Sequence, residues 1–222
     1  MQRSMTDKEK VSWQMVSMTK LVEKMASKSV HLCKTINLYY RSIIRREIAL
    51  ADIRSTDHVL FIGGGPCPCS AILIHEMTGA RVTVIDYDIS CINCSHNLIN
   101  KLGYSESIRS ICKNGSEIES LQSMPYTVIL VAAQVDTLDK VFNRIRNKSL
   151  HGTKILVRIP KQKLKKHYYG AHKMILKNIP RTLHTAINNL ESTCLYVKSA
   201  KTHEMDYPAA SDRFFVYSGE AI

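Results

Sequence analysis

Apolar runs of strand length alternate with apolar residues at helical spacing through the middle of the chain. His58–Ile62 is a β-rich apolar run that stops at three consecutive glycines. Apolar positions at helical spacing follow at residues 71–77, and Gly79 is a typical helix end. A second apolar run, 82–85, ends on Asp86. This order predicts strand, loop, helix and strand, the βαβ half of a nucleotide-binding sheet.

The alternation continues beyond Asp86 and predicts an α/β sheet. The last two strands are expected to run antiparallel at one edge, after a basic helical region. The expected strands lie at 107–112, 126–131, 154–158, 193–198 and 213–217, and the expected helices near 90–102, 137–146 and 161–177.

Residues 1–55 carry apolar side chains at helical intervals and contain no glycine or proline. Such a segment does not fit the alternation of strands and helices, so we expect a small helical cap over the nucleotide face. The predicted division is a cap at 1–55 and a Rossmann-like domain at 56–222.

Tyr40 and Glu47 lie at helical spacing near the end of this cap, together with Ile43 and Ile44. We expect all four on one side of a helix, with Tyr40 and Glu47 pointing toward the loop at Gly63. On spacing alone, however, Glu47 is favoured as a surface carboxylate paired with a neighbouring arginine. The neighbouring arginines are Arg41, Arg45 and Arg46.

The glycine loop and Asp86 together indicate a nucleoside ligand. Glycines let the backbone approach a ligand closely, and a carboxylate at the end of the second strand accepts hydrogen bonds from ribose hydroxyls. Pro66 and Pro68 stand where the dinucleotide motif G-x-G-x-x-G places its third glycine, and a proline lacks the N–H that a phosphate would use. S-adenosylmethionine (SAM), which has no phosphate, is therefore favoured over NAD. The alternative is an ordinary strand-turn-helix with a glycine-rich corner.

Other residues after the predicted strands complete the expected cofactor site. Asn114 is expected beside the adenine, and the small Ala132 and Ala133 leave room over the cofactor. An Asp- or Asn-Pro-Pro-aromatic motif, often found there in nucleic-acid amino-methyltransferases, is absent, which argues against base methylation. The expected cofactor-binding residues are Gly63, Gly64, Gly65, Pro66, Asp86, Tyr87, Asn114, Gly115, Ala132 and Ala133.

Length and composition fit one globular domain with an accessory segment, at 222 residues and 45% hydrophobic content. No stretch approaches the ~20 continuous apolar residues of a membrane span, and the polar N-terminus lacks the apolar core of a secretory signal. We therefore expect a cytoplasmic protein without a membrane partner. Whether it forms a homodimer is left open.

Seven cysteines, an odd number, are expected to be free thiols. The pairs Cys67-x-Cys69 and Cys91-x-x-Cys94 raise the alternative of a structural zinc, but four sulfurs would then have to gather where the cofactor is expected. Small buried core residues are the favoured interpretation, and no metal is expected.

The net charge of +12 raises the question of a nucleic-acid partner. Basic residues gather in two runs, at 41–46 and 161–167, but no aromatic-interleaved recognition motif accompanies them. Solvated faces or an anionic small substrate are therefore favoured over RNA.

Several segments of the chain resemble the nicotianamine synthases. The likeness spans about 37–160, and its Gly-Pro-x-Pro ending to the glycine loop is unusual among SAM proteins. The N-terminal part is shorter than in the plant enzymes, and we see no match beyond Arg158. The matching segments are Tyr39-Tyr40 with Glu47, residues 61–68, residues 128–141 and residues 151–158.

The resemblance implies a class I SAM-dependent methyltransferase fold that transfers the 3-amino-3-carboxypropyl group of SAM to an amine. Bacterial relatives attach this group to an amino acid such as histidine in metallophore biosynthesis. The family places a glutamate before the glycine loop as the base that takes the proton of the amine, which makes Glu47 the candidate. Tyr39 and Tyr40 would orient the amine of a small acceptor, and Arg158 would bind a carboxylate.

The sulfonium of SAM makes all three attached carbons electrophilic, so alignment with the nucleophile decides which group moves. The expected function is aminocarboxypropyl transfer to a small amino-acid-like acceptor. A SAM-dependent small-molecule methyltransferase is the first alternative. An RNA methyltransferase or RNA-binding protein is the second.

Overall fold

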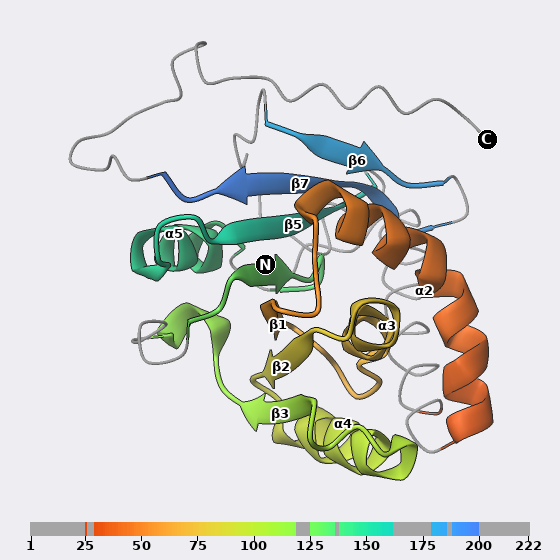
Figure 1. Cartoon of the computed structure of the whole chain (residues 1–222). Coiled ribbons are helices and arrows are strands. Elements are labelled where there is room, and N and C mark those ends of the chain that lie inside the picture. Colours follow the sequence, from red (N-terminus) through yellow and green to blue (C-terminus); the bar gives the residue numbers. More distant parts are fainter. Residues whose placement is uncertain are drawn as a thin grey trace, which may run out of the picture.

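Apolar runs along the chain pair into one seven-stranded sheet with helices on both faces (Figure 1). The computed structural model describes residues 25, 29–118, 125–135, 138–161, 179–185 and 188–199, and this count of strands refers to them. The strands are β1 (His58–Ile62), β2 (Arg81–Asp86), β3 (Ile108–Cys112), β4 (Val128–Val131), β5 (Lys154–Pro160), β6 (Arg181–Leu183) and β7 (Leu190–Val197). The helices are α2 (Val30–Ala51), α3 (Cys69–Thr78), α4 (Ile89–Leu102), the short 3₁₀ turn η1 (Gly115–Glu117) and α5 (Leu138–Lys148).

The strand order is β3-β2-β1-β4-β5-β7-β6. Strands β1 to β5 are parallel, and β7 runs antiparallel to both of its neighbours. The chain first builds outward from β1 through β2 to β3 and then returns to place β4 on the other side of β1. Open α/β sheets bind ligands at such a switch point, outside the carboxyl ends of the strands.

Alternate residues of the central strands face opposite sides of the sheet and build two separate cores. Phe61 and Val84 belong to the core under α2, α3 and α4. Leu60 and Ile62 belong to the core under α5. Figure 1 shows the first three helices on one side of the sheet and α5 on the other.

Helix α2 begins after Ser29, whose hydroxyl accepts a hydrogen bond from Leu32 N, and ends at Asp52 in the left-handed conformation. Its buried side chains fall on one helical stripe that packs on α3 and the sheet. Burial of one isoleucine of this stripe stabilises the fold by about 1.5–3 kcal/mol. The helix can therefore carry two polar side chains, Asn37 and Glu47, into the interior. The buried residues are Cys33, Asn37, Ile43, Ile44, Glu47 and Ala51.

The strands and helices predicted between residues 58 and 158 are confirmed, with ends shifted by no more than two residues. The strand expected at 193–198 is β7, which begins earlier at Leu190 and is antiparallel as predicted. Strand β6 was not expected, because three residues are too short to display an alternating pattern. The strand predicted at 213–217 and the segments 1–24 and 162–178 lie outside the described residues, and the division at residue 55 stays a prediction.

Candidate active site

The loop after β1 is held against β2 by its own backbone. The N–H groups of Gly63 and Gly64 both donate to the carbonyl of Ile85, at 2.9 and 3.3 Å. Gly63 has a φ of +82°, which L side chains rarely adopt. A Cβ on Gly64 would lie 2.1 Å from Cγ1 of Val84, so no larger residue fits there without movement. The loop therefore presents backbone without side chains at the carboxyl ends of the parallel strands.

Asp86 closes this loop from the end of β2. One carboxylate oxygen accepts from Gly65 N at 2.8 Å, and the other accepts from Asp88 N at 3.1 Å. A carboxylate oxygen has a further lone pair, so each oxygen can also accept from a ribose hydroxyl. The neighbouring Tyr87 is mostly exposed, and Pro66, in the loop, is buried.

The remaining residues expected at the cofactor follow the ends of β3 and β4. Asn114 caps η1, and its side-chain oxygen accepts from both N and Oγ of Ser116. Gly115 lies against Ile62, because a Cβ on it would be 2.7 Å from Cγ2 of that side chain. Ala132 N donates to Ile62 O, and Ala133 packs with residues of α2. All the expected cofactor residues thus lie at or just after the carboxyl ends of β1 to β4, on the same side of the sheet.

Glu47 is fully buried and forms an ion pair with Arg158. The guanidinium donates from Nε to Oε1 and from Nη2 to Oε2, both at 2.8 Å, and Thr193 Oγ1 donates to Oε1 at 2.7 Å. Glu47 is therefore not the surface carboxylate that its spacing favoured. The helix turns it toward β5 and β7, whereas the neighbouring arginines lie on the exposed side of α2. Those exposed residues are Arg41, Arg45 and Arg46.

Arg158 is itself only 4% exposed and lies over the ring of Phe61, 5.5 Å from its centre. A buried ion pair offsets its desolvation cost only when its geometry is good and its remaining hydrogen-bonding groups are satisfied. The two-point contact with Glu47 supplies this geometry. The carboxylate that Arg158 binds in this structure is therefore that of Glu47.

His184 extends the network around Glu47. Its Nε2 lies 2.8 Å from Thr193 Oγ1, and because that hydroxyl donates to Glu47, it must accept from Nε2–H. Burial is the main cause that lowers the pKa of His184, helped by Arg158 and Arg46 and opposed by Glu47. The lowered pKa favours the neutral imidazole, and the hydrogen bond to Thr193 places its proton on Nε2.

Tyr39 and Tyr40 lie edge to face, with ring centres 5.0 Å apart. Tyr39 Oη accepts a hydrogen bond from Asn189 N at 3.0 Å, and burial raises the pKa of this phenol. The phenol therefore keeps its proton and can donate it in a hydrogen bond to a ligand. Both rings pack beside Ile43, Ala133 and Leu190, which joins α2 to the ends of β4 and the start of β7.

Sequence reasoning missed several polar residues of this region. Thr193 lies in β7, and His184 directly follows β6. The residue pattern of neither strand indicates a functional site. Within the described part of the chain, three side-chain atoms are buried without a hydrogen-bond partner: Oδ1 of Asn37, Nδ1 of His184 and Nδ2 of Asn188. Such atoms are uncommon in folded proteins. Asn37 was detectable, because it interrupts an apolar helical stripe.

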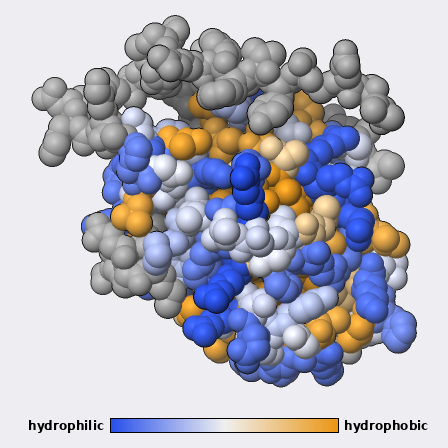
Figure 2. Space-filling model, viewed as in Figure 1, coloured by the Kyte–Doolittle hydropathy of each residue, from blue (hydrophilic) through white to orange (hydrophobic). Residues whose placement is uncertain are grey.

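Of the two basic runs, the structure describes all of 41–46, whose arginines lie on the exposed side of α2, and little of 161–167. Arg46 donates to the carbonyl of Leu183, and of the run 161–167 only Lys161 is described. On the face seen in Figure 2, hydrophilic side chains are interspersed with hydrophobic ones. In the same part of the chain, α2 and the other helices are too short or too polar to cross a bilayer.

Two curated proteins are similar to this chain, and both are named L-histidine 2-aminobutanoyltransferase. The one from Yersinia pestis is 26% identical over 96 residues, which is 43% of this chain and 35% of the relative. The one from Pseudomonas aeruginosa is 27% identical over 115 residues, which is 52% of this chain and 43% of the relative. The matched region thus spans less than half of each relative. No protein-family model matches the chain.

Solved structures give the wider comparison. The nicotianamine synthase MtNAS, in complex with MTA and tNA, superposes with a TM-score of 0.70 at 22% identity, over 82% of this chain and 72% of that one. A glutamate-to-glutamine mutant of MtNAS in complex with SAM gives 0.68 at 22% identity, over 86% and 76%. An RNA methyltransferase from Salinibacter ruber with S-adenosylhomocysteine gives 0.53 at 16% identity, over 74% and 95%.

The fold is that of the class I SAM-dependent methyltransferases. This confirms the fold class predicted from the sequence. The predicted resemblance to nicotianamine synthase-like proteins is confirmed as well, because relatives found by sequence and by structure both belong to that group.

Proposed function

We propose that this chain is a SAM-dependent transferase that moves the 3-amino-3-carboxypropyl group of SAM to an amine of a small amino-acid-like acceptor. The observation that carries the proposal is the buried Glu47, fixed by Arg158 and Thr193 beside the carboxyl edge of a SAM-type sheet. The similarity to two L-histidine 2-aminobutanoyltransferases and to MtNAS supports it.

SAM is the proposed co-substrate. Its ribose hydroxyls would donate to the carboxylate of Asp86, and its nucleoside would lie along the backbone of Gly63 and Gly65. The hydrogen bond from Gly65 N to Asp86 supports this arrangement, because it already joins the glycine loop to the ribose-binding carboxylate. Structural neighbours solved with SAM or S-adenosylhomocysteine support the same choice.

In the proposed reaction, the lone pair of the acceptor amine attacks the γ-carbon of the aminocarboxypropyl group. The bond from this carbon to sulfur breaks, its electron pair returns to the sulfur, and 5′-methylthioadenosine leaves. The ammonium form of the acceptor must first lose a proton, which we assign to Glu47. Oε1 of Glu47 already accepts two hydrogen bonds and Oε2 accepts one, so Oε2 has the capacity to receive it.

Arg158 has a different role in this proposal from the one its sequence suggested. Its two-point contact fixes the orientation of Glu47 and balances the buried charge, so we propose a positioning role in place of binding a substrate carboxylate. Tyr39 and Tyr40 remain the proposed contacts to the acceptor, because they lie on the same face of α2 as Glu47.

The identity of the by-product tests the proposal. Purified protein is incubated with SAM and L-histidine, with other small amino acids as further acceptors, and the products are separated by mass spectrometry. Release of 5′-methylthioadenosine together with an acceptor heavier by one aminocarboxypropyl group is the expected result. S-adenosylhomocysteine with a methylated acceptor would establish the methyltransferase alternative instead.

We also propose a cytoplasmic location. None of the seven cysteines forms a disulfide bond in the structure. Proteins of reducing compartments keep their cysteines in this state. Fractionation of the producing cell, with detection of the chain by antibody, tests this location.

A further inference from the structure

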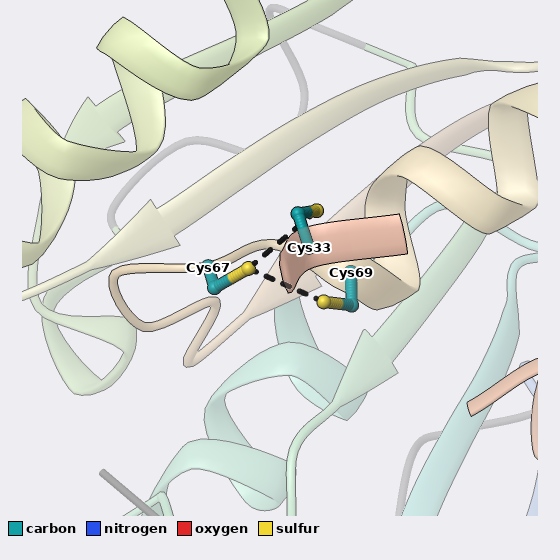
Figure 3. Close-up of side chains that lie close together, drawn as sticks. All are labelled: Cys33, Cys67 and Cys69. Carbon is teal, nitrogen blue, oxygen red and sulfur yellow. Dashed lines mark hydrogen bonds between the residues drawn. The ribbon is translucent and has the colours of Figure 1, made fainter. Parts of the chain in front are cut away.

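Three cysteine side chains from separate parts of the chain converge on one point (Figure 3). Cys33 comes from the first turns of α2, Cys67 from the loop after the glycines and Cys69 from the first residue of α3. The Sγ atom of Cys67 lies 3.7 Å from that of Cys33 and 3.3 Å from that of Cys69, and all three lie within 4.8 Å of one another. Each residue is at most 4% exposed.

We propose that Cys33, Cys67 and Cys69 form a three-thiolate binding site for a thiophilic metal ion, with Zn²⁺ as the preferred ion. Zinc binds thiolates at about 2.3 Å with tetrahedral angles, which places the sulfurs about 3.8 Å apart. The separations of 3.7 and 3.3 Å, with the third pair within 4.8 Å, lie around this spacing, so metal binding requires only small side-chain movements. This site differs from the four-cysteine arrangement considered from the sequence, because Cys91 and Cys94 lie on α4 and Cys33 takes part instead.

The surroundings favour sulfur in the thiolate form. Cys69 begins α3, whose first turn contains no acidic residue, so the positive end of this helix faces the cluster without a competing carboxylate. This helix end favours thiolates, and the geometry of the cluster would let them coordinate a bound cation.

The net charge of the metal complex distinguishes Zn²⁺ from Cu⁺, two ions that thiolates bind well. Three thiolates with Zn²⁺ leave one net negative charge, and three thiolates with Cu⁺ leave two. Because burial of net charge is costly, the zinc complex is favoured at this site. Among the described residues, no fourth Cys, His, Asp or Glu joins the group, so an external ligand would complete the tetrahedron.

Metal binding is tested on the full chain, reduced and stripped of metal under anaerobic conditions. It is titrated with Zn²⁺ against a chromophoric chelator, and in a parallel arm with Cu⁺. Wild type is expected to bind one equivalent of zinc and to gain thermal stability from it. Cys33→Ala and Cys67→Ala should each weaken zinc binding at least 100-fold. Cys194→Ala is the matched control, because this buried cysteine of β7 lies outside the cluster.

A second measurement does not depend on the variants folding. Wild-type protein is alkylated with and without zinc, and mass spectrometry maps which thiols react. Protection by zinc of the three cluster thiols, and not of Cys91 or Cys94, is the expected pattern. Reduced protein that takes up no metal would mean that the three thiols only fill the core, and a disulfide within the cluster would mean a redox pair; either result overturns the proposal. Tighter binding of Cu⁺ than of Zn²⁺ would overturn the choice of ion.

Discussion

Glu47 shows how strongly the surroundings of a single residue determine what a substitution does. An exposed glutamate tolerates exchange for glutamine with little effect on stability. Glu47 is fully buried against Arg158, so the same exchange removes the counter-charge of a buried guanidinium. Effects on catalysis and on stability must therefore be separated in any test of its role.

We predict that Glu47→Gln lowers turnover by about 10²- to 10⁴-fold, which is the usual contribution of a positioned base. The free energy of unfolding should fall by about 3–5 kcal/mol, because one partner of a buried ion pair loses its charge. SAM binding should persist. Steady-state kinetics with both substrates saturating, urea denaturation and calorimetry measure the three quantities.

The double variant Glu47→Gln/Arg158→Met is the control for this prediction. Removal of the unpaired guanidinium should restore much of the lost stability, because apolar replacements of buried ion pairs are well tolerated. Turnover should stay low. If turnover recovered together with stability, Glu47 would be a structural residue and not the base.

Asp86 gives a prediction about the cofactor. Asp86→Asn should weaken SAM binding by about 1.5–3 kcal/mol, because a charged acceptor is lost from the hydrogen bonds to the ribose. Calorimetry measures this affinity. Asp88→Asn is the matched control, since asparagine also caps helices well and α4 should keep its N-terminal cap. Equal SAM affinity in wild type and Asp86→Asn would remove Asp86 from the site.

At the scale of elements, the contact between the glycine loop and β2 limits what the loop can accept. Gly64→Ala would place a methyl group 2.1 Å from Cγ1 of Val84. We predict a loss of stability of about 1–3 kcal/mol, the usual cost of overpacking. Thermal and urea denaturation measure it. In the double variant Gly64→Ala/Val84→Ala, the losses of stability from the two substitutions should be less than additive. Strict additivity would show that the new methyl group does not clash with Val84.

The central strands and helices, and the expected cofactor-binding residues at the carboxyl ends of the strands, were predictable from local patterns. His58–Ile62, the glycines and Asp86 lie within about 30 residues, and their order alone fixes strand, loop, helix and strand. The partners of Glu47 were not predictable in this way. Arg158 and Thr193 are 111 and 146 residues away, and their contacts depend on how α2 docks against β5 and β7. The convergence of Cys33 on Cys67 depends on how the first turn of α2 docks beside α3, which no local pattern encodes.

At the scale of the whole molecule, two histidines link stability to pH. Burial lowers the pKa of His184 and of His58, whose ordinary value is 6.5, and nearby arginines add to the effect. Below about pH 6.5 the unfolded chain therefore takes up protons that the folded chain resists. We predict that stability is full above this pH and falls as the pH drops toward the lowered values, by at most about 1.4 kcal/mol per pH unit for each histidine.

Urea denaturation at pH 7.5, 6.5 and 5.5 measures this effect. His184→Gln keeps an N–H donor near Thr193 but does not titrate in this range. The stability difference between wild type and this variant should therefore shrink, or turn in favour of the variant, as the pH falls. A difference that stays constant with pH would show that His184 titrates alike in the folded and unfolded chain.

The ion pair of Glu47 and Arg158 also has a consequence for synthesis. The ribosome makes α2 long before β5 and β7, so a nascent chain carries Glu47 without the guanidinium and hydroxyl that later surround it. Contacts between segments so distant in sequence form late and slowly in folding. The glycine loop and Asp86, which are neighbours in sequence, can assemble first. An unfinished chain would therefore hold the parts that bind the nucleoside before it holds an ordered base, and only chains that have reached β7 can complete the site.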